Sequence, residues 1–218
     1  MSILIVQQKL KAAGFDPGPL DGRWGATTEL ALDAAIGIEQ SGSLAWGNKV
    51  SAEFRKKVFA GCRDQGIPAD SLMACMAWES AESFSSDIRN AAGSGAVGLI
   101  QFMPSTAKDM GTSTALLAGM TPERQLDYVF AYFRPYKGRL KTLADIYMAI
   151  LWPAAIGRPE SSSLWTADER PTTYRQNSGL DLNRDRVISK AEAAAKVQQK
   201  LMKGVKPPYV WRSSDGKR

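Results

Sequence analysis

Histidine is missing from this sequence: none of its 218 residues is a histidine. Zinc hydrolases with histidine ligands, Ser-His-Asp hydrolases and Cys-His peptidases all need an imidazole, as a metal ligand or as a base that titrates near neutral pH. These three classes of enzyme are therefore excluded. Acid-base chemistry in this chain has to rely on carboxyl groups, and 22 Asp and Glu residues are available.

Cysteine is almost as scarce, with Cys62 and Cys75 as the only two. Their spacing matches neither a CxxC metal pair nor the dense framework of a disulfide-rich secreted domain. We expect both to be buried free thiols on apolar helix faces. A single stabilising disulfide is the alternative.

Long apolar runs are lacking as well. A membrane-spanning helix needs roughly 18 to 20 apolar residues, and the best candidate, residues 146–156, is interrupted by Pro153. Residues 1–10 do not combine a basic start, a long apolar stretch and a small-residue cleavage site, so they do not resemble a signal peptide. We therefore expect no stable membrane insertion and synthesis in a cytoplasm.

Positive charge is in excess, since 28 Lys and Arg against 22 Asp and Glu give a formal net charge of +6. This charge favours anionic partners at low salt. The basic residues are scattered, however, with 55–57 as the only compact run, and no zinc-finger or aromatic-basic RNA-binding motif is present. We expect a solvated basic surface and no nucleic acid partner.

Apolar residues recur at helical spacing through most of the chain, and few alternating runs would make a strand. The predicted fold class is therefore all-α. One helix ends near Gly14, a cluster of turn-forming residues follows at 15–22, and a second helix carries Thr28. The helical pattern lapses at the small polar residues 41–43, which predicts one domain over residues 1–44 and a second over residues 45–218.

The first of these domains carries a spaced set of residues: Val6-Gln7-Gln8-Lys9-Leu10, Gly14-Phe15, Asp21-Gly22, Gly25 and Thr28. This set resembles the small peptidoglycan-binding module of many cell-wall enzymes. In physical terms, Asp21 and Gly22 make a turn, Gly25 permits close packing, and Thr28 can bond to the loop backbone. The resemblance implies wall binding, whereas the alternative is a purely structural role for these residues. The candidate wall-binding residues are Asp21, Gly22, Arg23, Trp24, Gly25 and Thr28.

In the second domain, the apolar segment 72–78 leads into a carboxylate, Glu79, almost without a polar break. Burial and the negative end of the helix dipole both disfavour the charged form, so we expect the pKa of Glu79 to be raised. A carboxyl group that stays protonated near neutral pH can donate a proton to a glycosidic oxygen. The alternative is a Glu on the exposed edge of the helix, paired with Arg89 or solvent.

Glu79 and Ser80 are followed at residues 90–107 by NAAGSGAVGLIQFMPSTA. This pattern resembles the lytic transglycosylase signature of the lysozyme-like superfamily, which phage endolysins share. In that signature Glu-Ser ends a helix and a Gly-Leu-Met-Gln turn follows, with Ile100 here in place of the more frequent Met. The resemblance implies that Glu79 is the catalytic acid and base, and that its neighbours bind the sugar: Ser80, Gln101, Phe102 and Met103.

A third part of the family signature is an Ala-Tyr-Asn triplet whose Tyr lies near the catalytic Glu. It is only partly present, around Tyr147, and the Asn is missing. Tyr147 is the best match for a substrate-site tyrosine, and Tyr174 is the rival candidate. Either tyrosine has a core aromatic role as its alternative.

A calcium-loop template also fits in part, because Asp181, Asn183, Asp185 and Glu192 occupy its positions 1, 3, 5 and 12. Arg186, however, replaces the glycine that the sharp turn needs. We therefore expect no metal and no other cofactor. The prediction is an Asx-rich turn that caps a helix beginning near Ser189, with calcium binding as the alternative.

The resemblance implies a complete reaction on peptidoglycan. Glu79 protonates the leaving oxygen of the β-1,4 linkage between N-acetylmuramic acid (MurNAc) and N-acetylglucosamine (GlcNAc). As a carboxylate it then removes the proton from the C6 hydroxyl of MurNAc, which leaves a 1,6-anhydro product. Glu82 and Asp87 receive no role in this scheme, and Glu82 is expected to be a solvated surface group.

Two alternatives stay open at this point. One is a hydrolytic muramidase that uses the same Glu and water; the other is a non-catalytic wall-binding or virion structural protein that keeps the fold. We expect a monomer whose partner is the peptidoglycan glycan strand, and which reaches the wall after release from a host cytoplasm. The residues do not decide between a phage endolysin, a virion-associated enzyme and a bacterial enzyme.

Overall fold

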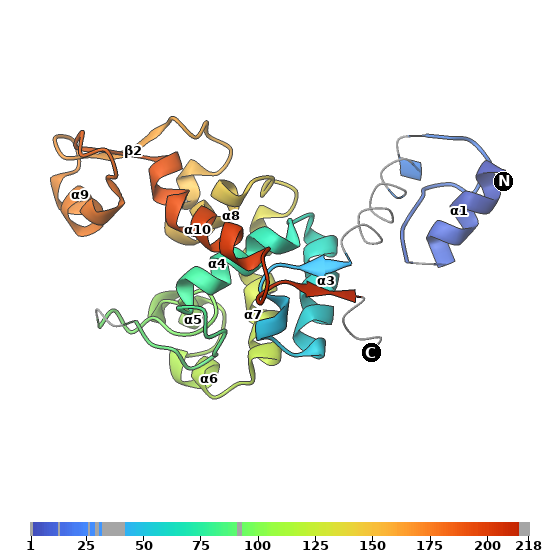
Figure 1. The fold of residues 1–218 in the computed structure, drawn as a ribbon, viewed down its shortest axis with the longest axis horizontal. Helices are drawn as coiled ribbons and strands as arrows, with labels where there is room; N and C mark the ends of the chain where they lie inside the picture. The colour runs from blue at the N-terminus through green and yellow to red at the C-terminus, as the bar shows by residue number, and fades with distance from the viewer. Residues whose placement is uncertain are drawn as a thin grey trace. The chain divides into compact units, whose positions relative to one another are not determined.

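The structure is a computed structural model of the chain, and it describes residues 2–12, 14–25, 27–28, 31, 42–90 and 93–213. The chain divides into two compact units, residues 1–43 with 212–218, and residues 44–211. The described elements are mostly helices with a few short strands (Figure 1), which confirms the all-α fold class. Among the helices in these ranges, none combines the length and the apolar character that a membrane span requires.

The first unit is organised around one buried amide, that of Gln7 on α1 (Ile3–Ala12). Its Nε2 donates to Asp21 Oδ1 at 3.2 Å, to the Arg23 carbonyl at 2.9 Å and to Thr28 Oγ1 at 3.1 Å. Its Oε1 accepts from the Gly22 backbone N–H at 2.9 Å. One side chain thus fastens the loop to the helix, a contact that its place in the module's sequence pattern does not by itself reveal.

The residues predicted to bind the wall are placed as follows. Asp21, Gly22 and Thr28 serve the loop itself, since Thr28 is buried and donates to the Pro17 carbonyl at 3.0 Å. The close packing expected at Gly25 is not found, because no described atom lies within 4 Å of a Cβ built there. Arg23 and Trp24 are exposed, Trp24 by 46%.

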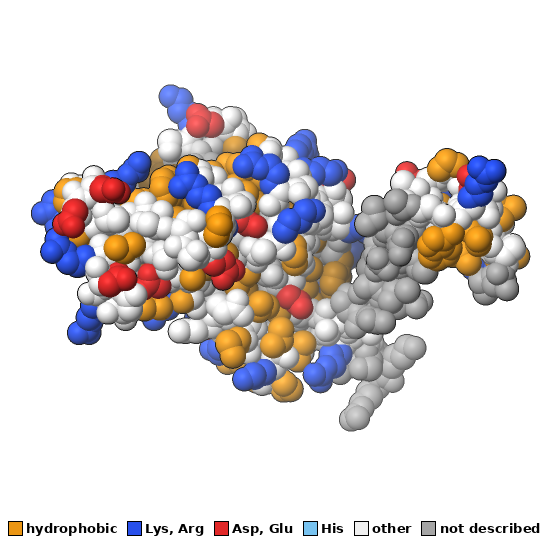
Figure 2. Space-filling model, turned by 90° about the horizontal axis from the view of Figure 1, so that it is seen from above, with side chains coloured by type: hydrophobic (Ala, Val, Ile, Leu, Met, Phe, Trp, Pro, Cys, Tyr) orange, Lys and Arg blue, Asp and Glu red, His pale blue; other side chains and the backbone are white. Residues whose placement is uncertain are grey.

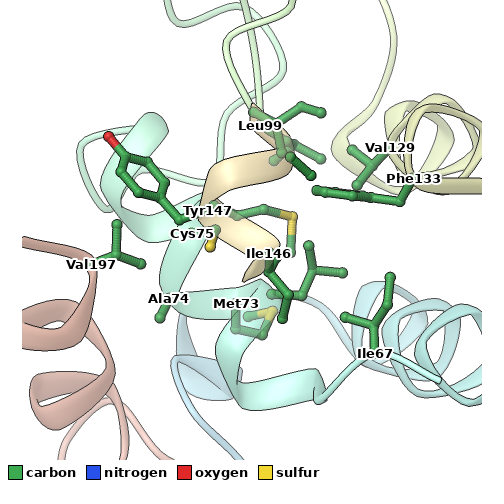
Figure 3. Packing of buried hydrophobic residues seen from close by; sticks show 14 of the residues in the cluster. Ile67, Met73, Ala74, Cys75, Leu99, Val129, Phe133, Ile146, Tyr147 and Val197 are labelled. Carbon is green, nitrogen blue, oxygen red and sulfur yellow. The ribbon is translucent and has the colours of Figure 1, made fainter. Parts of the chain in front are cut away.

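The second unit is built around α4 (Ala69–Glu79), whose residues from Ser71 to Ala77 are all buried. It packs against α3 (Ala52–Gln65), α8 (Leu143–Leu151) and α10 (Lys190–Gly204) (Figure 1). Figure 3 shows the side chains of Met73 and Cys75 on α4 near those of Ile146 and Tyr147 on α8. This all-round burial explains why the α4 sequence has no polar face.

Both cysteines belong to this core. Cys62 and Cys75 are buried and free, as the sequence predicts. Burial in apolar surroundings raises the pKa of both thiols, so neither is a nucleophile at neutral pH.

The remaining elements surround α4, and Ser or Thr residues cap several of the helices. Side chains of Ser51, Ser113, Thr121, Thr142 and Ser189 accept a backbone N–H in the first turn of α3, α6, α7, α8 and α10. The other helices of this unit are α5 (Pro104–Asp109), α6 (Thr114–Ala118), α7 (Pro122–Phe133), α9 (Pro171–Asn177) and the 3₁₀ turns η1 (Gly47–Lys49), η2 (Arg134–Tyr136), η3 (Pro153–Ala155) and η4 (Ser178–Leu180).

Two small sheets complete the fold. β1 (Ser43–Leu44) pairs with β4 (Trp211–Arg212), and β2 (Ser163–Thr166) pairs antiparallel with β3 (Val187–Ser189). The β2–β3 hairpin carries α9 between its strands, and we call residues 157–189 the arm (Figure 1).

A buried ion pair fixes the base of the arm. Lys190 Nζ lies 2.6 Å from Asp145 Oδ1, with side chains 2% and 8% exposed. Lys190 Nζ also donates to the Arg158 carbonyl at 2.8 Å, and the Gly157 N–H donates to Asp145 Oδ1 at 2.8 Å. Because the two charges are paired and further hydrogen-bonded, their burial is tolerated and the arm is tied to α8.

A second ion-pair group holds the turn at residues 80–84, directly after α4. Glu82 Oε1 lies 2.6 Å from Lys200 Nζ, and its Oε2 lies 2.7 Å from Lys203 Nζ, both on α10. Burial acts to raise the pKa of Glu82, but the hydrogen bonds and charges of the two lysines outweigh it and hold this pKa below its usual value. The expectation that Glu82 is a solvated surface group is therefore wrong.

We predict that Glu82→Gln lowers the free energy of unfolding by about 1 kcal/mol at low salt, because two lysines lose their shared counter-charge. The loss should shrink at 1 M salt, where screening weakens the repulsion between Lys200 and Lys203. Denaturant unfolding at two salt concentrations measures it. The control is Glu160→Gln, since Glu160 is exposed and forms no ion pair among the described residues. Equal stability of Glu82→Gln and wild type at both salt concentrations would contradict this role.

Candidate active site

Glu79 is the last residue of α4, where the helix ends against a tightly held turn. The Ser80 backbone N–H donates to the Met76 carbonyl at 2.9 Å, and the Ser80 hydroxyl donates to the same carbonyl at 2.6 Å. The Ser80 oxygen also accepts from the Phe84 N–H at 3.0 Å. Ser80 is 0% exposed, so it shapes the turn behind Glu79 and presents no hydroxyl to a ligand.

The environment of Glu79 makes it a weak acid. Burial raises the pKa of Glu79 from 4.5 to about 7, because an apolar surrounding disfavours the charged form. This is the direction that the sequence predicts from the apolar helix. At neutral pH the group is then divided between its protonated and ionised forms, as a group that both gives and takes a proton requires.

Of the two candidate tyrosines, Tyr147 of α8 is the one that interacts with Glu79. Its hydroxyl accepts a hydrogen bond from Trp78 Nε1 at 3.2 Å, and Trp78 precedes Glu79 on α4. Burial, followed by the charge of Glu79, raises the pKa of Tyr147 above its usual range. Tyr147 therefore stays a neutral hydroxyl beside the carboxyl group.

Tyr174, the rival candidate, lies elsewhere. It belongs to α9 in the arm, and its hydroxyl donates to Asp181 Oδ2 at 2.6 Å. The structure thus uses Tyr174 to hold the loop before β3 and places Tyr147 at the carboxyl group.

A further tyrosine near Glu79 was not anticipated from the sequence. Tyr132 of α7 donates its hydroxyl proton to the Ala149 carbonyl at 2.6 Å. Burial, then the charges of Tyr136 and Glu79, raise the pKa of Tyr132 to about 12. It follows Glu79 by more than fifty residues and has no motif of its own, so only the fold shows their proximity.

The predicted sugar-binding turn is a short hairpin closed by Val97 and Phe102, whose backbone groups exchange hydrogen bonds of 2.8 and 3.1 Å. Gln101 has a positive φ of 52°. Its Nε2 donates to the Ile88 and Gly98 carbonyls at 3.3 and 3.2 Å. The amide donor of Gln101 is thus used to close the turn, and its Oε1 is the part that can still accept from a sugar.

The two residues after Gln101 have opposite environments. Phe102 is 2% exposed and packs edge-on against Tyr132, with ring centroids 6.2 Å apart, so it belongs to the core. Met103 is 44% exposed at the start of α5. Of this pair, only Met103 presents its side chain to a ligand.

Gln125 of α7 holds this turn from the side, a role that the sequence does not indicate. It is fully buried on α7, accepts from the Leu99 N–H at 2.8 Å, and donates to the Ser86 and Leu117 carbonyls at 3.0 and 2.9 Å. A Cβ on Gly98 would come within 2.3 Å of the Gln125 amide, and Gly98 has a φ of 82°. Glycine is therefore required there both by space and by backbone conformation.

The residues that match the calcium-loop template form hydrogen bonds with neighbouring parts of the chain. Asp181 accepts the backbone N–H groups of Arg184 and Arg186, and Ser189 with Glu192 forms a capping box at the start of α10. This confirms the predicted helix-capping turn. Across the described ranges, the structure contains no group of three or more Asp, Glu, Cys or His side chains placed to hold a metal ion.

The raised pKa makes stability depend on pH. The folded chain holds the Glu79 proton more tightly than the unfolded chain does, so this contribution to stability is complete below pH 4.5 and is lost as pH rises to about 7. We predict that Glu79→Gln matches wild type at pH 4 and is more stable at pH 8, by at most about 3 kcal/mol at 1.36 kcal/mol per pKa unit. Denaturant unfolding at both pH values tests this. If the difference in stability between the variant and wild type does not change with pH, folding does not raise the pKa of Glu79.

Comparison with known families agrees with this geometry. Residues 58–149 match the model of the Transglycosylase SLT domain, a span that includes Glu79, the hairpin at 97–102 and Tyr147. A search of curated proteins found no match to the chain. Residues 58–149 therefore form a transglycosylase SLT-type enzyme domain of the lysozyme-like superfamily, a family that comprises lytic transglycosylases acting on peptidoglycan.

Proposed function

We propose that this protein is a peptidoglycan lytic transglycosylase that cleaves the MurNAc–GlcNAc β-1,4 bond, with Glu79 as its single catalytic acid and base. The observation that carries the proposal is the burial of Glu79 at the end of α4, within the SLT-type segment, with a pKa raised to about 7. A lower pKa would leave too little acid at neutral pH, and a much higher one would leave too little base.

The reaction uses the two forms of this carboxyl group in turn. The protonated Glu79 donates its proton to the glycosidic oxygen as the C1–O bond of MurNAc breaks, and GlcNAc leaves with a hydroxyl. The ionised Glu79 then takes the proton from the C6 hydroxyl of MurNAc, whose oxygen bonds to C1. The product is 1,6-anhydroMurNAc, and Glu79 ends protonated as it began.

This scheme needs no carboxylate nucleophile, and the acidic residues next to Glu79 in sequence support it. Glu82 is held by Lys200 and Lys203. Asp87 accepts a hydrogen bond from the Ser85 hydroxyl and is exposed. Glu82 is thus committed to ion pairs and Asp87 to a surface hydrogen bond, whereas a retaining glycosidase uses its second carboxyl group, about 5 to 5.5 Å from the first, as a nucleophile.

The first unit is proposed to bind the wall, so that it holds the enzyme on its substrate. The loop around Gln7 supports this role, because Gln7 holds the backbone of Gly22 and Arg23, and the exposed side chains of Arg23 and Trp24 follow directly. Trp24 offers an apolar face to sugar rings, and Arg23 offers charge to the anionic wall.

The setting that we propose is lysis of a bacterial host by a phage-encoded endolysin, acting as a monomer after release from the host cytoplasm. The support is the resemblance of the Glu79 segment and of the first unit to such enzymes. The net charge of +6 suits an anionic wall, and Figure 2 shows Lys and Arg side chains spread over the visible face of the larger unit.

Glu79→Gln keeps the size of the side chain and removes the transferable proton. We predict that it folds normally and loses turnover by about 10² to 10⁴-fold or more, since one group serves as both acid and base. The assay is turbidity clearance of purified peptidoglycan. The matched control is Glu53→Gln on α3, an exposed carboxylate in the first turn of its helix, which should keep wild-type clearance.

The products of the wild-type enzyme separate the two possible reactions. Mass spectrometry of the released muropeptides should find 1,6-anhydro ends. Reducing ends would instead identify a hydrolytic muramidase that uses the same acid. Near wild-type clearance by a folded Glu79→Gln would overturn the catalytic assignment itself.

For the first unit, we predict that a chain starting at Gly42 keeps its lytic activity on fragmented peptidoglycan and binds intact sacculi less tightly. The start at Gly42 preserves the β1–β4 pairing. Sedimentation with sacculi measures the bound fraction for both chains. Equal binding by the two chains would remove the wall-binding role from this unit.

A further inference from the structure

Two arginine side chains lie against one tryptophan at the end of α8. The guanidinium carbons of Arg158 and Arg170 lie 5.6 and 5.4 Å from the ring centroid of Trp152. Trp165 of β2 packs beside it, with centroids 5.5 Å apart. Cations within about 6 Å of an indole face are attracted to it. We call these four residues the arginine cluster.

The backbone of the cluster is held from several sides. The Arg158 N–H donates to the Ala155 carbonyl at 3.1 Å, and its carbonyl accepts from the buried Lys190. The Arg170 N–H donates to the Thr166 carbonyl at 3.1 Å, and its carbonyl accepts from the Tyr174 N–H at 2.8 Å. The two guanidinium groups are therefore presented from fixed points at the base of the arm, which lowers the entropy lost on binding a ligand.

The charges of the cluster are not neutralised within the described part of the chain. Arg158 and Arg170 are exposed, and neither forms an ion pair with a described acidic residue. Asp168, two residues before Arg170, pairs with Arg186 instead, at 2.8 Å. A guanidinium that stacks on a ring keeps its N–H donors at its edge, where they match the two oxygens of a carboxylate.

The cluster begins where the helix that carries Tyr147 ends. Trp152 directly follows Leu151, the last residue of α8, and stands five residues after Tyr147 in the chain. Tyr147 in turn interacts with Glu79. Peptidoglycan strands are long polymers, so a strand that is cleaved at Glu79 reaches beyond the catalytic group together with the groups that branch from its sugars. In peptidoglycan these branches are short peptides that carry free carboxylates.

We propose that the arginine cluster binds a carboxylate of the peptide stem of peptidoglycan and makes the enzyme select glycan strands that carry stems. The inference rests on the proposed function, because it concerns the substrate of Glu79. It assigns recognition to the arm, which the SLT-type span of residues 58–149 does not include.

The test compares two substrates and three variants. The substrates are glycan strands with their stems and the same strands after an amidase has removed the peptides, both free of phosphate-containing wall polymers. For Arg170→Gln and for Arg158→Gln, the KM on stem-bearing strands should rise about 10-fold, as expected for loss of a charge-assisted bidentate contact, with kcat unchanged. On stem-free strands both variants should match wild type. The control, Arg175→Gln, removes one exposed charge from the same arm and should leave both KM values unchanged.

Several results would overturn the inference. A KM that stays at the wild-type value on stem-bearing strands, or that rises equally on both substrates, excludes a stem contact. A difference that appears only when phosphate-containing wall polymers are added back assigns the site to phosphate instead. Arg170→Lys keeps the positive charge and loses the planar guanidinium with its paired N–H donors. A wild-type KM for this variant on stem-bearing strands therefore excludes bidentate binding. A wild type without activity on either substrate overturns the proposed function as well, whereas wild-type activity with unaffected variants overturns the stem contact alone.

Discussion

The burial of one carboxyl group at the end of an almost wholly apolar helix is the constraint on which the rest of the second unit depends. Glu79 ends α4, and the seven preceding residues from Ser71 to Ala77 are buried by α3, α8 and α10. An ionised carboxylate in such a place is costly, so the folded chain keeps the proton and the pKa rises to about 7. Packing that is needed for stability therefore also sets the chemistry.

The turn after α4 contains three residues with strained backbone conformations. Ala81, Glu82 and Phe84 all have positive φ values, of 50°, 66° and 52°, each unfavourable by roughly 1 to 2 kcal/mol for a residue with a Cβ. The Ser80 oxygen, which accepts the Phe84 N–H, and the ion pairs of Glu82 with α10 offset this strain. Since they lie directly beyond Glu79, they hold the end of α4 and the direction of its carboxyl group.

Local patterns predicted the parts of this site that are local in sequence. The apolar run into Glu79, the glycine at 98 and the capping turn before α10 can all be read from adjacent residues, and the all-α class follows from helical spacing. Gln7, Gln125 and Tyr132 cannot, because their partners lie 14 or more residues away for Gln7 and up to 39 for Gln125. Glu82 was misjudged for the same reason, since Lys200 and Lys203 are more than a hundred residues further along the chain.

The absence of histidine gives the pH behaviour of this enzyme a simple form. Glu79, at a pKa of about 7, changes charge near neutrality, and no imidazole titrates beside it. The protonated fraction of Glu79 therefore falls as the pH rises through this value. With Glu79 as the acid and base that we propose, the pH dependence of kcat/KM reports the proton on this one group.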